Sequence, residues 1–448
     1  MFKQVIQGNG FYSRDKESVC YLEQCLICIN DDGIIQKVVG QEASQYNELR
    51  MQYMLEGRLK ILDKDQILLP GFVDLHVHAS QWPQAGMALD KPLEVWLQEY
   101  TFPLESKLED VETAYGIYSE VVQTTLNNAT TSAMYFATVD PKTTLLLSKL
   151  CAEKGQRGFV GTVAMDEQDN APSYYRDANA STSASKTVEL INQITKVQVR
   201  YHQKAYPVVT PRFIPTCSRE ALIMLGKVAQ EHDAYIQSHV SESDWEHGFV
   251  KEKTGMNDAQ ALDTYGLLTS KTILAHANFL EESDGELLAQ KGASIAHCPL
   301  SNSYFANSVL PVRRLMEQGV NIGLATDISG GYSPSMYQAI RQAVISSKML
   351  QDGVNPNLPS DKRGVNNSAI TLNTAFYMAT VAGGLALNLK LGKFEPGYIF
   401  DAQVVNICEN LPRYNQEKSK EDLLHKVLLL AQRENIKEVW VQGVQVIK

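Results

Sequence analysis

Short apolar segments recur along the middle of the chain, separated by longer stretches in which apolar residues follow a helical spacing. Eight segments read as buried strands, at residues 71–78, 130–136, 158–165, 206–213, 234–240, 272–277, 293–298 and 321–326. Amphipathic helices are predicted between them, for example over residues 220–232 and 282–291. The polar segment 166–185 predicts an irregular loop. Apolar strands alternating with helices indicate a parallel sheet covered on both faces. Eight of them favour an α/β fold of the closed (β/α)8 type, with a doubly wound sheet as the alternative.

The two ends of the chain have a different pattern. Residues 1–67 contain short β-like segments around the tight-turn sequence Asp31-Asp32-Gly33. Residues 395–448 also contain segments that alternate like strands. We therefore expect both chain ends to pair into a small discontinuous β-sandwich domain, beside a barrel domain over residues 68–394.

The overall composition is that of an ordinary globular protein, with 44% hydrophobic and 21% charged residues in 448. The net charge of −10 and the lack of a basic stripe argue against a nucleic-acid partner. No apolar run has the length of a signal peptide or a membrane span, so we expect a cytoplasmic protein that does not contact a membrane. The seven cysteines are an odd number and suit reduced thiols better than a disulfide framework.

Four of the nine histidines and one aspartate stand at the ends of predicted strands. His76 and His78 form a His-X-His pair, and residues two apart on a strand point to the same side. His239 and His276 end the fifth and sixth strands, and Asp327 follows the eighth. Polar groups at the C-terminal ends of barrel strands face the active site. A lone histidine at such a place is more often structural, but four strands that all end this way favour a metal site.

His76, His78, His239 and Asp327 are the predicted ligands of one divalent metal, either zinc or iron(II). Three neutral imidazoles and one carboxylate leave a position for water, whose pKa a cation lowers towards ~7. No lysine ends the third or fourth strand, so the bridging lysine of a two-metal site is not evident. His297 ends the seventh strand, and we expect it beside the metal rather than on it.

Three residues are candidates for proton transfer. Asp327 can accept a proton from the attacking water, and His276 can hydrogen-bond the nucleophile or polarise the substrate. Glu242 lies three residues beyond His239, past the strand end, where a carboxyl group can move protons between a ring nitrogen and a leaving group. The alternative for Glu242 is a solvated loop glutamate. The pattern predicts a metal-dependent hydrolytic enzyme.

The segment from Pro70 to His78 resembles the opening signature of the amidohydrolase superfamily. Further motifs resemble its guanine deaminase family: His78-Ala79-Ser80-Gln81, Tyr100-Thr101-Phe102-Pro103-Leu104-Glu105, Pro211-Arg212-Phe213, His239-Val240-Ser241-Glu242, His297-Cys298-Pro299 and Thr326-Asp327-Ile328-Ser329. The resemblance runs from about residue 65 to 350. It implies hydrolysis of guanine to xanthine and ammonia by a zinc-dependent homodimer. It also implies the metal ligands and catalytic groups named above, with Gln81, Arg212 and Phe213 holding the purine.

The implied purine contacts are chemically reasonable. Attack at C2 turns the O6/N7 edge of guanine away from the metal, and an arginine fork matches its two acceptors. Gln81 can reach a ring nitrogen or the exocyclic amine, and Phe213 can pack on the ring face. For Arg212 a structural ion pair is the alternative.

Other functions remain open at this point. Residues 82–86 and 243–247 depart from the family pattern, so an 8-oxopurine, a pterin or a triazine is an alternative substrate. A non-catalytic scaffold of this fold would have lost metal ligands, and all of them are present. A nucleic-acid base deaminase would need a basic track for the backbone.

Overall fold

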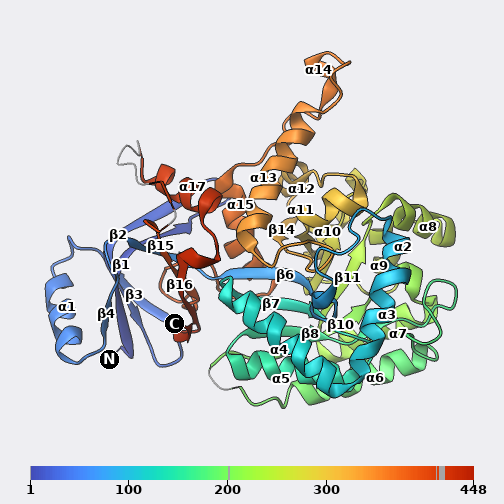
Figure 1. The fold of residues 1–448 in the computed structure, drawn as a ribbon, viewed down its shortest axis with the longest axis horizontal. Coiled ribbons are helices and arrows are strands. Elements are labelled where there is room, and N and C mark those ends of the chain that lie inside the picture. The colour runs from blue at the N-terminus through green and yellow to red at the C-terminus, as the bar shows by residue number, and fades with distance from the viewer. Residues whose placement is uncertain (1, 200–201, 410, 413–418) are drawn as a thin grey trace.

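The computed structural model of the chain describes residues 2–199, 202–409, 411–412 and 419–448 and contains two separate sheets (Figure 1). The larger sheet is parallel, and its strands follow one another in chain order. They are β6 (Phe72–His78), β7 (Thr130–Phe136), β8 (Arg157–Gly161), β10 (Tyr206–Pro211), β11 (Tyr235–Val240), β12 (Thr272–His276), β13 (Ser294–His297) and β14 (Asn321–Leu324), with the short β9 (Val163–Ala164) beside β10. All eight predicted strands are confirmed. The third is interrupted at Thr162, so β8 ends at Gly161 and the two residues Val163 and Ala164 form β9.

The first and last strands of this sheet meet. Beyond β14 the N–H of Asp327 donates to the carbonyl of His76 over 3.0 Å. Next to this bond, fully buried Asp74 accepts the N–H of Thr326 over 3.0 Å and its hydroxyl over 2.6 Å. The strands therefore form a nearly closed barrel, as predicted, rather than an open doubly wound sheet with two free edges.

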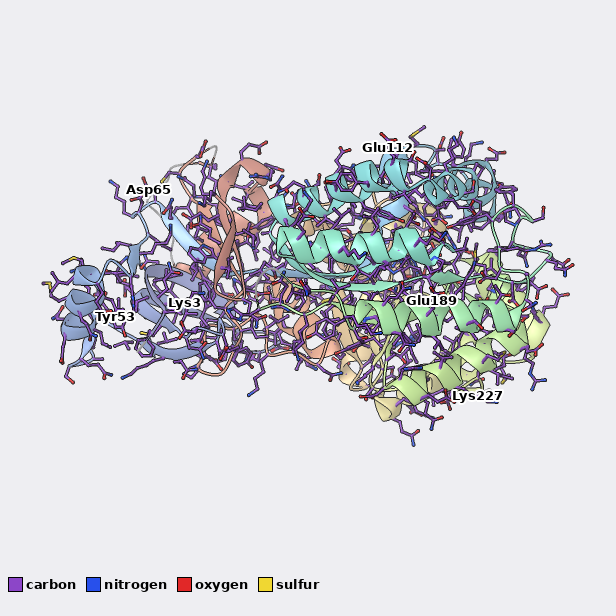
Figure 2. All side chains as sticks on the ribbon, turned by 90° about the horizontal axis from the view of Figure 1, so that it is seen from below. Lys3, Tyr53, Asp65, Glu112, Glu189 and Lys227 are labelled. Atoms are coloured by element: carbon purple, nitrogen blue, oxygen red, sulfur yellow. The ribbon has the colours of Figure 1, made fainter. Side chains whose placement is uncertain are left out.

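Helices surround the barrel. Four of them end at a C-cap residue with left-handed backbone: Gly155, Asp233, Gly255 and Gly292. The longer ones are α4 (Val111–Asn127), α5 (Pro141–Lys154), α6 (Ala180–Ile194), α7 (Arg219–His232), α8 (Asp244–Thr254), α10 (Glu282–Lys291) and α13 (Met336–Asp352). Figure 2 shows α4, α6 and α7 on the outside, with Glu112, Glu189 and Lys227 directed to solvent. None of the helices in the described part of the chain is long and apolar enough to cross a membrane.

The predicted loop over residues 166–185 is wrong at its C-terminal end, because α6 begins at Ala180. The side chain of Asn179 accepts the N–H of Thr182 and starts the helix. Small and hydroxyl residues, among them Ala180, Ser183 and Ala184, form the buried face of its first turns. Such residues carry little hydrophobic signal, so the helical spacing is not visible in the sequence.

The second sheet is mixed and combines both chain ends, as predicted. Its strand order is β17-β16-β15-β5-β1-β2-β3, with β4 on β1. These are β1 (Gln4–Ser13), β2 (Val19–Ile29), β3 (Ile35–Val39), β4 (Leu59–Ile61), β5 (Gln66–Pro70), β15 (Ala402–Asn406), β16 (Ile436–Val441) and β17 (Val444–Ile447). The antiparallel pair β5–β15 joins the two ends, and β5 runs directly into β6 of the barrel. The domain boundaries at residues 67/68 and 394/395 stay a prediction.

A long segment between β6 and α4 covers the C-terminal mouth of the barrel. It contains short helical turns: η1 (Ala79–Gln84), α2 (Leu93–Trp96), η2 (Leu97–Thr101), α3 (Phe102–Glu105) and η3 (Ser106–Glu109). Its side chains Trp96 and Phe102 are buried in one apolar cluster with Phe136 and Phe213 of the barrel. The segment therefore packs against residues at the C-terminal ends of the barrel strands.

Candidate metal centre and active site

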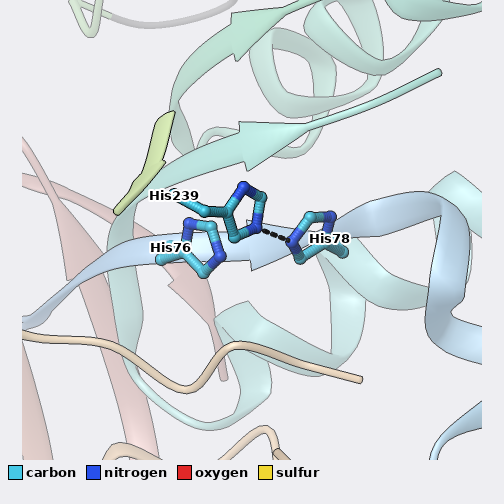
Figure 3. A group of neighbouring side chains, drawn as sticks. All are labelled: His76, His78 and His239. Carbon is cyan, nitrogen blue, oxygen red and sulfur yellow. Dashed lines mark hydrogen bonds between the residues drawn. The ribbon is translucent and has the colours of Figure 1, made fainter. Parts of the chain in front are cut away.

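The five residues predicted at strand ends converge at the barrel mouth. Figure 3 shows His76 and His78 of β6 turned towards His239 of β11. The Nε2 atoms of His78 and His239 lie 3.0 Å apart. Asp327 places Oδ1 3.2 Å from His76 Nε2 and 3.6 Å from His78 Nε2, and its Oδ2 lies 3.8 Å from His276 Nε2. These distances between potential donor atoms are short enough for one ion to bind between them.

The chemistry of these side chains fits a divalent cation. Nε2 of His76 and Nε2 of His276 are buried, and neither has a hydrogen-bond partner among the described residues. Burial lowers the pKa of His76, His78 and His239 well below the usual range, so these rings are neutral and each has a lone pair. Nδ1 of His239 lies 2.6 Å from the carbonyl of Arg212 and donates to it, so the lone pair is on Nε2.

His276 is held close to two carboxyl groups. Its Nδ1 lies 2.9 Å from Oδ1 of Asn302 and donates to it, which leaves Nε2 free. This Nε2 lies 3.6 Å from Glu242 Oε1, on the side opposite the hydrogen bond to Asn302. The backbone of His276 has φ +74°, which is unfavourable for a residue with a side chain. The strand end is therefore strained in the conformation that brings the ring to the carboxyl groups.

Glu242 lines the pocket and is 6% exposed, so it is not a solvated loop residue. Ser241 has φ +45°, which breaks the strand alternation just before Glu242. The Glu242 peptide is held on both sides: Glu246 accepts its N–H over 2.6 Å and Asn278 donates to its carbonyl over 3.0 Å. Burial, reinforced by repulsion from Asp327, raises the pKa of Glu242 well above the usual range. A carboxyl group of this kind can keep and deliver a proton.

The cluster opens onto a pocket with about 350 Å³ of space between and in front of its lining atoms, open solvent included. Both polar and apolar groups line it. The polar lining is formed by His78, Gln81, Arg212, His239, Glu242 and Asp327, and the apolar lining by Leu93, Trp96, Leu97, Phe213 and Phe305. All three residues predicted to hold a purine, Gln81, Arg212 and Phe213, are thus in this pocket.

Glu105 is a further residue beside this pocket, and sequence reasoning did not single it out. It is fully buried and binds Arg212 through two contacts, Nη1 to Oε2 at 2.8 Å and Nη2 to Oε1 at 3.4 Å. The guanidinium also lies over the ring of Phe102, 5.0 Å from its centre. Burial opposes the charge of Arg212, but the Glu105 carboxylate outweighs it and raises the pKa of Arg212. Arg212 thus forms the structural ion pair that was the alternative to a substrate contact, and it also lines the pocket.

Two other histidines differ in their surroundings. His297 is buried, but it belongs to none of the metal-suited groups formed by the described residues. Burial lowers the pKa of His297 to about 3. The side chain of His247 is only 17% exposed. Its Nδ1 lies 3.2 Å from the hydroxyl of Ser241 and 3.6 Å from Asp258, so it buttresses the Glu242 loop.

Comparison with known proteins agrees with this geometry. The model of the Amidohydrolase family matches residues 67–446. The chain belongs to the amidohydrolase family. It is 36% identical over 442 residues to the guanine deaminase of Mus musculus, covering 95% of this chain and 92% of that protein. It is 32% identical to the guanine deaminase of Dictyostelium discoideum, covering 98% and 97%.

A solved structure is similar over almost the whole length. It is the crystal structure of guanine deaminase from C. acetobutylicum with bound guanine in the active site. This structure is 30% identical in sequence, covers 99% of both chains and superimposes with a TM-score of 0.87. The predicted resemblance of this amidohydrolase to guanine deaminases is thereby confirmed.

Proposed function

We propose that this chain catalyses the hydrolytic deamination of guanine to xanthine and ammonia. The observation that carries the proposal is the meeting of two groups of residues in one pocket. The histidine–aspartate cluster can hold a metal, and Arg212 with Gln81 can hydrogen-bond an oxo-purine. The similarity to guanine deaminases over more than nine tenths of the chain supports the same substrate.

We propose that His76, His78, His239 and Asp327 would bind one zinc ion, and that iron(II) is an alternative with the same ligands. A cation bound there would act as a Lewis acid that makes a water molecule nucleophilic near neutral pH. The ligand atoms already lie together in the described structure, with the His76 Nε2 to Asp327 Oδ1 distance at 3.2 Å. Little rearrangement is therefore needed to bind the ion.

Proton transfers fall to three side chains. Asp327 accepts a proton from the water as its oxygen adds to C2 of guanine. Glu242, whose pKa is raised by burial, delivers its proton to the ring nitrogen beside C2. The proton of the added hydroxyl then passes through Glu242 to the departing amine, and the proton held by Asp327 returns to Glu242. His276 faces both carboxyl groups and can hydrogen-bond the attacking oxygen. The carbon–nitrogen bond breaks, ammonia leaves and the 2-oxo group of xanthine remains.

The remaining pocket residues hold the base. Arg212 donates to the oxo edge of the purine, and its position over Phe102 fixes the plane of the guanidinium. Phe213 is 2% exposed and lines the pocket, where it can pack against the ring face. On family resemblance we further propose a homodimer located in the cytoplasm.

A measurement of ammonia release tests the proposal. Purified protein is offered guanine, 8-oxoguanine, a pterin and an aminotriazine, and the metal content of the same sample is measured by elemental analysis. We expect guanine to be the best substrate, with about one zinc or iron per chain. Metal-loaded protein that releases no ammonia from guanine would refute the proposal. Faster release from another compound of the panel would show that this compound, and not guanine, is the preferred substrate.

A further inference from the structure

We propose that Glu105 is a positioning residue that fixes which atoms of the purine site donate and which accept hydrogen bonds. In this role it selects bases that carry a carbonyl next to an N–H group. The inference rests on the proposed function for the identity of the ligand, but the contacts that carry it are those of Glu105 itself.

The Glu105 carboxylate is fully used within the protein. Its Oε1 accepts from Gln81 Nε2 at 2.9 Å and from Arg212 Nη2 at 3.4 Å. Its Oε2 accepts from Arg212 Nη1 at 2.8 Å. The hydroxyl of Ser80 lies 3.3 Å from Oε1 and shares its one proton with the carbonyl of Ala137 at 3.1 Å, so both carboxylate oxygens are occupied by protein donors. Glu105 is not among the residues that line the pocket, so it can act on a ligand only through its neighbours.

The contact with Glu105 sets the orientation of the Gln81 amide. An ionised carboxylate only accepts hydrogen bonds, so Gln81 has to turn its NH₂ group towards Glu105. The amide oxygen of Gln81 then points away and receives no hydrogen bond from the described residues. Because Gln81 lines the pocket, this oxygen is the acceptor offered to a ligand.

Arg212 supplies the donors next to that acceptor. Two of its five N–H groups bind Glu105, and the other three can only donate. Gln81 and Arg212 both bind the same carboxylate oxygen, so they lie side by side. The site therefore presents a donor group adjacent to an acceptor.

This arrangement complements a lactam edge. Guanine, xanthine and hypoxanthine carry the acceptor O6 next to the donor N1–H, which suits Arg212 and Gln81 respectively. A 6-aminopurine has the reverse order, with a donor amine next to an acceptor nitrogen. Binding such a base would leave polar groups of the site unpaired, which is a strong source of discrimination.

Replacement of Glu105 by glutamine removes the constraint. An amide at this position can accept or donate, so the Gln81 amide is free to turn over, and Arg212 loses its charged partner. Glu105→Gln should therefore reduce discrimination between the two kinds of edge. A purely structural role would instead weaken the binding of both kinds of base equally.

The test compares binding of hypoxanthine and adenine by calorimetry, since neither base carries an amino group at C2 and no turnover is needed. The variants are Glu105→Gln and Gln81→Met, which removes the acceptor but keeps the ion pair. The matched control is Asp401→Asn, which breaks another buried arginine–carboxylate pair, with Arg157 Nη1 and Asp401 Oδ2 2.6 Å apart. Arg157 begins β8, at the strand end opposite the site. Asp401→Asn should therefore lower the stability of the protein without changing the pocket.

We expect the wild-type chain and Asp401→Asn to bind hypoxanthine more tightly than adenine. In Glu105→Gln and Gln81→Met the preference should fall on the order of 10- to 100-fold. An undiminished preference in Glu105→Gln, or in Gln81→Met if Glu105→Gln does not fold, would overturn the proposal. A wild-type protein without any preference would also overturn it.

The ammonia assay separates this inference from the proposed function. Guanine and 2,6-diaminopurine carry the same amino group at C2 and differ at the edge that the site reads. A protein whose preference for hypoxanthine over adenine is lost in Glu105→Gln, but which releases no ammonia from guanine, would refute the proposed function and support the role of Glu105. A protein that deaminates guanine and 2,6-diaminopurine equally well would refute the role of Glu105 alone.

Discussion

Arg212 is bound to Glu105 and also lines the pocket, so it has a predicted role in stability and another in substrate binding, and a double variant can separate the two. Arg212→Met removes the charge and both bonds to Glu105, at 2.8 and 3.4 Å, while a long apolar side chain can still pack on Phe102. The carboxylate of Glu105 is left without a charged partner at 0% exposure. In the double variant Arg212→Met/Glu105→Gln this buried charge is also removed.

The magnitudes follow from the burial of the pair. Breaking one partner of a buried ion pair costs about 3–5 kcal/mol of unfolding free energy, whereas removing both partners is often close to neutral. We therefore expect Arg212→Met to be destabilised by that amount and the double variant to regain most of it, a coupling of about 2 kcal/mol or more. A lost charged hydrogen bond to the substrate is equivalent to about 1.5–3 kcal/mol, or about 10- to 150-fold in kcat/KM.

Urea unfolding and ammonia release from guanine are measured on the same preparations of the wild-type protein and of both variants. We expect the double variant to recover stability but not activity, because the substrate contact is still missing. If its kcat/KM returns to the wild-type value, Arg212 is only a structural residue. If the single variant is as stable as the wild type, the reasoning on the buried charge is wrong.

Three further predictions concern the metal ligands, the proton donor Glu242 and the buried carboxyl group of Glu246. His239→Asn should bind far less than one metal per chain by elemental analysis, whereas His297→Asn should keep it, since only His239 belongs to the metal-suited groups; equal metal loss in both would contradict the ligand assignment. Glu242→Gln should lower kcat by about 10²–10⁴-fold with unchanged metal content, and a loss below tenfold would argue against proton transfer by this residue. Burial, with repulsion from nearby carboxylates, raises the pKa of Glu246 well above the usual range. The folded wild type therefore keeps a proton that the unfolded chain releases, and its stability falls as pH rises above the ordinary carboxyl range. Glu246→Gln, which retains an acceptor for the Glu242 N–H, lacks this loss. Its stability relative to the wild type in urea unfolding should rise with pH, by up to about 1.4 kcal/mol per pH unit, and parallel curves would count against the assignment.

Sequence reasoning reached the histidine–aspartate cluster because the information on its residues is local. The apolar runs give the strands, and each chemical residue stands at the end of one, such as His76 and His78 on β6 or His276 on β12. Strands of a parallel barrel end at a common mouth, so residues at these positions meet without any further information on packing. This dependence on local pattern also explains the error at the start of α6. The residues buried there, such as Ala180, are small and give only a weak hydrophobic signal.

What the sequence by itself determined was therefore the barrel, the order of its strands and the residues that point into its mouth. Tertiary structure alone decided how those residues are held. The bond between Glu105 and Arg212 joins residues 107 positions apart, and no local pattern marks it. The left-handed turn at Ser241 that brings Glu242 into the pocket depends on Glu246 and Asn278, because a strained backbone persists only where surrounding contacts hold it.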